Sequence, residues 1–228
     1  MAAVLMTALT MTACNMNEVP EITGTDYTVE APVKYDLKDY KGRIENVASE
    51  ALTRWRPTKE NMVEHADVIV EGTVVSATYT SIGSLPWTQL DVVVNESYDG
   101  GLSVGDAISV YYLGGYMPLK EYYEGLSESG DVPEGGYEFA PEDENAMFHI
   151  AQTFEEAPEI GDTFLLPLLE TESDALPTGV YEISAVGESA VYVKTGDGVY
   201  YCESAEAEWT VDELYTLIEE RNAQALEF

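Results

Sequence analysis

Between residues 67 and 113, and again between residues 163 and 202, the chain contains short segments in which apolar and polar residues alternate, separated by turns rich in glycine and aspartate. Alternation with a period of two is the pattern of a strand with one buried face. The predicted strands are residues 67–79, 89–98, 107–113, 163–171, 180–186, 190–194 and 199–202. We therefore expect a mainly β domain.

Three local signals refine this prediction. Gly72 lies inside the first strand, where glycine indicates a bend or bulge. Pro167 lacks a ladder donor and predicts that the fourth strand is an edge strand or is bulged. The sequence Thr195-Gly196-Asp197-Gly198 predicts a hairpin.

Helical patterns flank the strands. Apolar residues from Ile44 to Trp55 recur at helical spacing, and Thr58 is a candidate N-cap for a short helix through Ala66. Near the C-terminus, Thr210 and Glu213 form a capping box, and Trp209 and Leu214 occupy the staple positions. We expect a helical segment before the strands and one helix after them.

Period-two alternation also selects one face of each strand as the buried face. These inward-facing residues are predicted to be Val68, Val70, Val74, Leu90, Val92, Val94, Ile108, Val110, Phe164, Leu166, Ile183 and Val191.

The stretch 114–160 is far longer than the usual connection of about 4–6 residues. It is acidic, yet it holds seven aromatic rings, which a disordered insert would lack. We expect it to be partly ordered against the domain and to carry the candidate binding surface, formed by Tyr116, Tyr122, Tyr123 and Tyr137.

The N-terminus resembles a secretory signal. Residues 2–13 are apolar or small, and Met11-Thr12-Ala13-Cys14 resembles a bacterial lipobox, in which the cysteine is lipidated. No Lys or Arg precedes this run, which would place the true start of the signal upstream of Met1. The expected organisation is a signal peptide (1–13), a lipidated tether (14–43) and a domain (44–228) with the acidic insert 114–160. Cys202 is then a small core residue, and no internal disulfide is expected.

The segment His65-Ala66-Asp67-Val68-Ile69-Val70-Glu71-Gly72 resembles the first barrel strand of netrin-like modules, which include the tissue inhibitors of metalloproteinases. The layout is also similar to uncharacterised lipoproteins of Gram-positive bacteria, through Gly105–Val110, Gly114-Gly115 and Asp197–Tyr200. The resemblance implies a Greek-key β-barrel of the oligonucleotide/oligosaccharide-binding (OB) type. It does not carry the inhibitor function, because the disulfides of those inhibitors are absent here.

Charge limits the partners of this chain. Its 228 residues include 43 acidic and 10 basic ones, a net charge of −33. Nucleic acid and anionic lipid headgroups would be repelled by such a surface. The densest acidic group, Glu142, Asp143 and Glu144, is a weak candidate for Ca²⁺ at low affinity, although a solvated acidic face explains it better.

No motif for catalysis or cofactor binding stands out, and no cofactor is expected. His65 is interpreted as a solvated histidine at a helix end, and His149 as a partly buried structural one. The favoured function is a non-catalytic lipoprotein on the outer face of the cytoplasmic membrane, held there by its lipid anchor and binding an unknown protein or glycan. A secreted hydrolase with a carboxylate pair and a protease-inhibitor-like module are the alternatives.

Overall fold

The computed structural model describes residues 42, 44–48, 58–129, 145–151, 158–171, 175–183, 191–196, 198–202 and 207–225. The strands are β1 (Ile44–Ala48), β2 (Val68–Ile82), β3 (Leu85–Asp99), β4 (Ala107–Leu113), β5 (Gly115–Pro118), β6 (Met147–Ala151), β7 (Thr163–Glu170), β8 (Tyr181–Ile183), β9 (Tyr192–Gly196), β10 (Val199–Cys202) and β11 (Ala207–Thr210). The helices are α1 (Lys59–His65), α2 (Leu119–Ser129) and α3 (Val211–Ala225). The protein is mainly β, as predicted.

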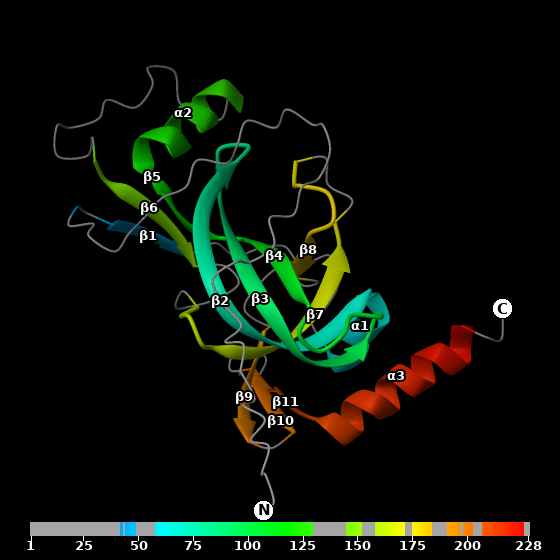
Figure 1. Ribbon diagram of the computed structural model, residues 1–228. Coiled ribbons are helices and arrows are strands. Elements are labelled where there is room, and N and C mark those ends of the chain that lie inside the picture. The colour runs from blue at the N-terminus through cyan, green and yellow to red at the C-terminus, as the bar shows by residue number, and fades with distance from the viewer. Residues whose placement is uncertain are drawn as a thin grey trace, which may run out of the picture.

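Five strands close a barrel of the OB type, as Figure 1 shows around β2 and β3. They follow each other around the wall in the order β7-β2-β3-β4-β8, and β8 pairs again with β7 to complete the circle. All neighbours are antiparallel except β4 and β8, which run parallel. Closure leaves no free edge in this ring, which removes the hazard of unpaired strand edges.

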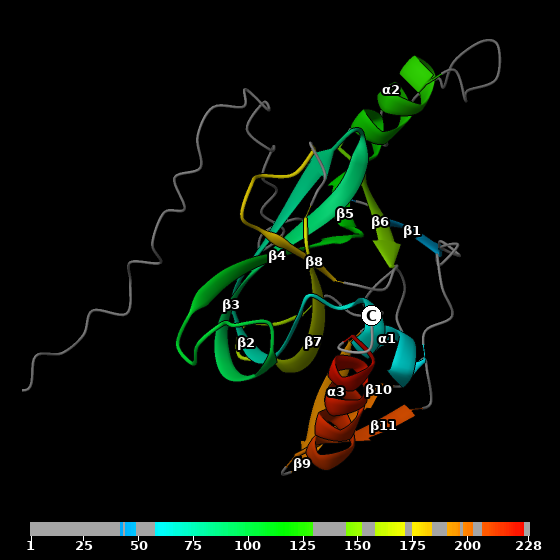
Figure 2. The same ribbon diagram turned by 90° about the vertical axis from the view of Figure 1, so that its right-hand side faces the viewer.

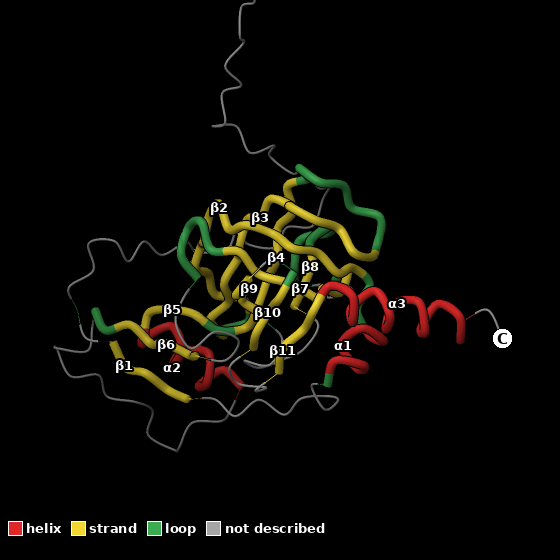
Figure 3. Tube along the Cα trace, turned by 90° about the horizontal axis from the view of Figure 1, so that it is seen from below, coloured by secondary structure: helices red, strands yellow, loops and turns green. Residues whose placement is uncertain are grey.

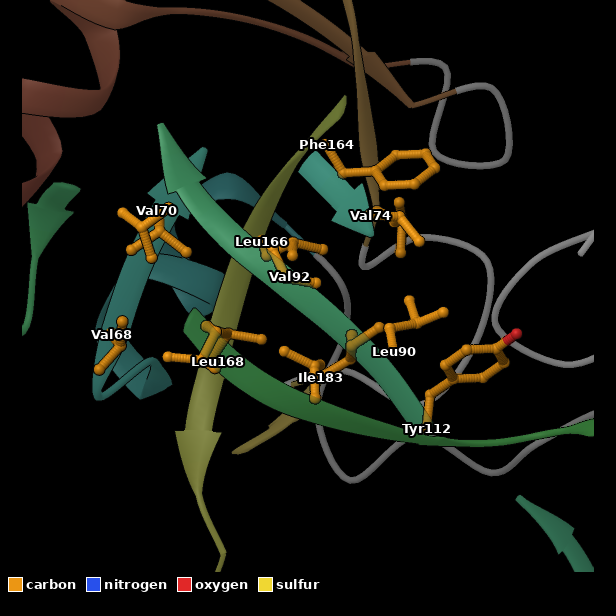
Figure 4. Close-up of a cluster of buried hydrophobic side chains, with 14 residues drawn as sticks. Val68, Val70, Val74, Leu90, Val92, Tyr112, Phe164, Leu166, Leu168 and Ile183 are labelled. Atoms are coloured by element: carbon orange, nitrogen blue, oxygen red, sulfur yellow. The ribbon is translucent and has the colours of Figure 1, made fainter. Parts of the chain in front are cut away.

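The predicted core is confirmed. All twelve side chains that alternation assigned to the interior are buried in one cluster, which also contains Tyr112 and Leu168. Figure 4 labels members of this cluster from each of the five barrel strands, and their side chains point toward one another. A one-residue slip in any strand would have turned its set outward, so the predicted registers are correct.

Gly72 lies at an irregularity of the β2–β3 ladder, as its sequence position predicted. The register shifts between Glu71 and Gly72. A Cβ atom on Gly72 would lie 2.2 Å from Cγ1 of Val92, so only glycine lets the two strands approach this closely.

The prediction of β7 as an edge or bulged strand is wrong, because β7 is paired on both sides. It pairs with β2 along one side, and with β9 and then β8 along the other. Pro167 lies between the part of β7 that contacts β9 and the part that contacts β8. The carbonyl of Leu168 accepts from the Asp67 amide on the β2 side at 2.9 Å, so by alternation the nitrogen of Pro167 faces the opposite side. A missing N–H is tolerated there because β7 changes partner at that point.

The predicted helix from Ile44 is also wrong where the structure describes it. Residues 44–48 form β1, which pairs in parallel with β6, and residues 49–57 lie outside the described residues. Pairing with a distant strand outweighs a weak local helical period. The short helix after Thr58 is confirmed as α1, and Thr58 accepts a hydrogen bond from the Asn61 amide at 3.3 Å.

The described strands of the insert, β5 and β6, form a second, smaller sheet together with β1, in the order β1-β6-β5, with α2 next to it (Figure 2). Met117, Leu119, Phe148 and Ile150 make its own buried cluster. This sheet approaches one end of the barrel, where Thr88 donates a 2.9 Å hydrogen bond to the Gly114 carbonyl. These parts of the insert are therefore ordered by apolar packing, as its aromatic content predicted.

The C-terminal strands and helix pack on the outside of the barrel, and α3 extends away from the small sheet (Figure 3). Trp209 and Leu214, the predicted staple pair, are buried in one cluster with residues of α1, β2, β7, β9 and β10. The Glu213 amide donates to Thr210 Oγ1 at 3.2 Å, which confirms the predicted cap of α3. Arg221 on α3 binds Asp99 and also donates to the carbonyls of Val63 and Ala66 at the end of α1.

Candidate functional site

The outer wall formed by β3 and β4 carries a polar surface whose side chains are joined by hydrogen bonds. Because Leu90 and Val92 face the core, Gln89 and Asp91 face outward. Across the ladder, Gln89 is opposite Tyr111 and Asp91 is opposite Ser109. We call the outward side chains Trp87, Gln89, Asp91, Ser109 and Tyr111 the β3–β4 face.

Side-chain hydrogen bonds join four members of this face. Ser109 Oγ and Gln89 Nε2 each donate to Asp91 Oδ1 at 2.8 Å. Tyr111 donates to Gln89 Oε1 at 2.8 Å, and this bond fixes which end of the amide faces Asp91. The network is therefore preorganised, with a carboxylate, an amide and two hydroxyls at set positions on a rigid wall.

Tyr111 keeps its proton under all ordinary conditions. Burial and the nearby charge of Asp91 raise the pKa of Tyr111 to about 12. The hydroxyl thus acts as a donor to Gln89 and supplies no phenolate near neutral pH. The chemistry of this face is hydrogen bonding.

The connection between β7 and β8 lies over the apolar end of this face. Leu176 and Val180 are buried against Tyr111, and Ile82 and Trp87 pack against the same cluster. In OB barrels the face of the second and third strands and the loops beside it are where ligands bind. Here β3 and β4 are the second and third strands of the barrel.

A second polar cluster, the Glu71 network, lies where the barrel meets the C-terminal strands. Glu71 is 4% exposed, and its Oε2 accepts hydrogen bonds from Tyr200 at 2.5 Å and from Lys194 at 2.9 Å. Tyr98 and Tyr200 share a 2.7 Å hydrogen bond between their hydroxyls, and Asn95 Nδ2 lies 3.4 Å from Glu71 Oε1.

The electrostatics of this network favour a charged carboxylate. Burial alone would raise the pKa of Glu71, but hydrogen bonds from Tyr200 and Lys194, with the lysine's charge, outweigh burial and lower it. The pKa of Tyr200 is raised by its own burial and by its hydrogen bond to Glu71. Glu71 is therefore an ionised, satisfied acceptor that ties β2 to β9 and β10.

In the described part of the domain, the positive charges of Lys and Arg are all paired with carboxylates. The four Lys and Arg side chains that follow residue 58 each lie in an ion pair: Lys59 with Glu213, Lys120 with Glu124, Lys194 with Glu71 and Arg221 with Asp99. The rest of the charged surface is carboxylate, which disfavours anionic ligands.

The structure places three of the four candidate binding tyrosines in packing contacts. Tyr116 stacks on His149 with ring centroids 4.2 Å apart, and Tyr122 stacks on Phe148 at 4.0 Å. Tyr123 is in edge contact with Tyr122. All three are partly buried, and none belongs to the β3–β4 face. Tyr137, the predicted lipidation site Cys14 and the calcium candidates Glu142, Asp143 and Glu144 lie outside the described residues.

The two histidines occupy the environments expected of them. His65 ends α1 and is exposed. His149 is 9% exposed in the small sheet, and burial lowers its pKa. Cys202 lies in β10, as the sequence predicted.

The hydrolase alternative needs two acids in one site, one with a raised pKa. Glu71 is the buried carboxylate in the part of the chain that the structure describes, and its pKa is lowered. In the same part of the chain, no group of three or more His, Cys, Asp or Glu side chains is placed to hold a metal ion.

The alternation that turns Leu90 and Val92 inward also puts Gln89 and Asp91 on the polar side of the same strand, but it does not mark them as functional residues. The signal was available, because an amide and a carboxylate alternate with core valines there. Glu71 gave one weaker signal, an acid inside the apolar run Val68–Val74. Its partners Lys194 and Tyr200 are more than a hundred residues away, beyond the reach of any local pattern.

None of the described helices has the length and apolar character needed to cross a bilayer. No protein-family model matches the chain, and neither does any curated protein.

Proposed function

We propose that this protein is a non-catalytic lipoprotein of the cell surface, anchored through Cys14, whose barrel binds a neutral glycan on the β3–β4 face. The observation that carries the proposal is the preorganised Gln89–Asp91–Ser109–Tyr111 network beside Trp87. A carboxylate and an amide at fixed positions suit the hydroxyls of a sugar, and an indole ring suits its apolar face.

The charge of the protein favours one of the two classes of ligand that OB barrels bind. These barrels bind oligonucleotides and oligosaccharides. A net charge of −33 repels a polyanionic nucleic acid, whereas a neutral sugar is indifferent to it. This argument supports the glycan partner over the nucleic acid.

Calorimetric titration with neutral tetrasaccharides of glucose and of N-acetylglucosamine tests the binding site. Gln89→Ala removes the centre of the network and should weaken binding about tenfold, the effect of losing one good hydrogen bond. Glu208→Ala, an exposed position on β11, is the matched control and should bind as the parent does. Equal affinity of all three proteins, or no binding by the parent, would contradict the proposal.

The anchor has a separate test. Cys14→Ser should release the protein into the medium or leave its signal unprocessed. If that variant still fractionates with membranes and carries lipid, the anchor is not at Cys14.

A further inference from the structure

The connection between β7 and β8 places two apolar side chains on the β3–β4 face. Leu176 and Val180 are each 5% exposed, while residues 175 and 177–179 are exposed. The segment contacts the wall through these two side chains, and the Val180 carbonyl also accepts a 3.2 Å hydrogen bond from the Thr171 amide just after β7. In Figures 1 and 2 this yellow segment lies beside the hairpin of β2 and β3.

The polar network does not need this segment. Its hydrogen bonds run between side chains of β3 and β4, so they would persist if Leu176 moved away. Gly179, at a φ of +77°, gives the segment a backbone position with little steric resistance to rearrangement. The wall is thus prepared before a ligand arrives. Residues 175–179 can move away from it about Val180, which stays held by Thr171 and by the pairing of the next residue, Tyr181, with β4 and β7.

A buried hydroxyl lies on the strand next to Trp87. Thr80 is 1% exposed, and its hydroxyl has no hydrogen-bond partner within the part of the chain that the structure describes. Thr80 is opposite Trp87 in the β2–β3 register, and both Trp87 and Ile82 pack against the Leu176–Val180 cluster. An unpaired buried hydroxyl costs free energy, and a ligand hydroxyl or water that reached it would recover that cost.

We propose that residues 175–179 form a displaceable cover, hinged at Val180, whose Leu176 occupies the ligand position in the free protein. When the cover leaves, a sugar takes the place of Leu176 over Trp87 and Tyr111 and pairs with the Thr80 hydroxyl. The identity of the ligand rests on the function proposed above, whereas the opening of the cover is a property of the free protein and can be measured without any ligand.

Thiol labelling measures the opening directly. Leu176→Cys places a thiol under the cover, and Leu168→Cys places the same substitution in the barrel core, where the residue is fully buried. Peptide mass spectrometry of the full chain separates these thiols from Cys14 and Cys202. The thiol at 176 should react at least about tenfold faster under native conditions, because local opening is more frequent than global unfolding. Equal rates would overturn the cover.

Thr80→Val tests the unpaired hydroxyl, with expected effects of opposite sign on stability and binding. Valine keeps the shape and removes a group that has no partner in the closed state, so the melting temperature should rise and, when combined with Leu176→Cys, labelling should slow. Affinity for the N-acetylglucosamine tetrasaccharide should fall about tenfold. A lower melting temperature would overturn the role given to Thr80.

Thr88→Val is the matched control on the same hairpin, since its hydroxyl does have a partner, the Gly114 carbonyl. It should lower the melting temperature and leave tetrasaccharide affinity unchanged; an equal loss of affinity would overturn the specific role of Thr80. If the thiol at 176 reacts fast but the parent binds no tetrasaccharide, the glycan assignment fails and the cover stands. If the tetrasaccharide binds and both thiols react equally slowly, the proposed function stands and the cover fails.

Discussion

Tyr200 on β10 donates a 2.5 Å hydrogen bond to the buried carboxylate of Glu71 on β2. This contact joins the barrel to the C-terminal strands at a point where burial would otherwise penalise the charge. Removing the donor should therefore cost more than an ordinary surface hydrogen bond.

Tyr200→Phe keeps the ring and deletes the hydroxyl. Hydrogen bonds to charged groups contribute about 1.5–3 kcal/mol, so the free energy of unfolding should fall by that amount. Tyr98→Phe is the control, because that hydroxyl bonds Tyr200 and not the carboxylate. Urea unfolding of both variants measures the free energy that each one loses. Equal losses would show that the hydrogen bond to the charged carboxylate of Glu71 is no stronger than the bond between the two tyrosines.

The lowered pKa of Glu71 makes this network sensitive to acid. A carboxyl group that binds its proton less readily in the folded state stabilises the fold above its unfolded pKa, near 4.5. That stabilisation is lost as the pH falls through the lower, folded pKa. The gap in unfolding free energy between the parent and Glu71→Gln should therefore shrink as the pH falls below 4.5. A gap that stays constant down to strong acid would argue against a charged Glu71.

His149 should produce a pH effect in a separate window. Burial lowers its pKa from 6.5, so the unfolded chain binds the proton more readily than the folded one. Stability should decrease as the pH falls through 6.5. His149→Phe should remove this slope, and His65→Gln, at an exposed position, should leave it in place. Denaturant titrations between neutrality and the onset of carboxyl titration measure the slopes.

Gly72→Ala should destabilise the barrel. The new methyl group would lie 2.2 Å from Cγ1 of Val92, and overpacking of a core costs about 1–3 kcal/mol. Gly196→Ala provides the comparison, because its Cβ would lie 4.0 Å from the nearest atom. A loss in thermal unfolding temperature confined to the Gly72 variant is expected; a neutral Gly72 variant would mean that the two strands can separate at that point.

The barrel was predictable because the alternation within each strand shows which of its residues face inward. The inward residues of β2, β3 and β4 recur at every second position and form one buried cluster, so local pattern and tertiary burial agree. The cap of α3 was predictable for the same reason, since Thr210 and Glu213 are three residues apart and act within one turn.

The remaining elements depend on partners far away in the chain. β1 became a strand because β6, about a hundred residues later, offers it a parallel ladder. From the sequence alone, Pro167 indicated an edge strand. No local pattern could show that β7 changes its partner from β9 to β8 at this proline. The Glu71 network could not be predicted either, because the partners of Glu71 are far away in the chain. The polar side of β3 was visible in the sequence, but the pattern did not show which of its side chains would form hydrogen bonds.

The parallel pairing of β4 with β8 has a consequence for the order in which the molecule folds. β2, β3 and β4 are consecutive hairpin partners, so they can assemble through contacts that are close in sequence. The seam that joins Val110 to Tyr181 and the seam that joins β7 to β2 both link strands far apart in the chain, and whichever forms second closes the barrel. Closing so distant a seam is slow because the chain entropy between its two sides must be lost first. A three-stranded, open precursor with β4 as its exposed edge is therefore the expected transient species, and the rate of barrel closure rather than of hairpin formation should limit refolding.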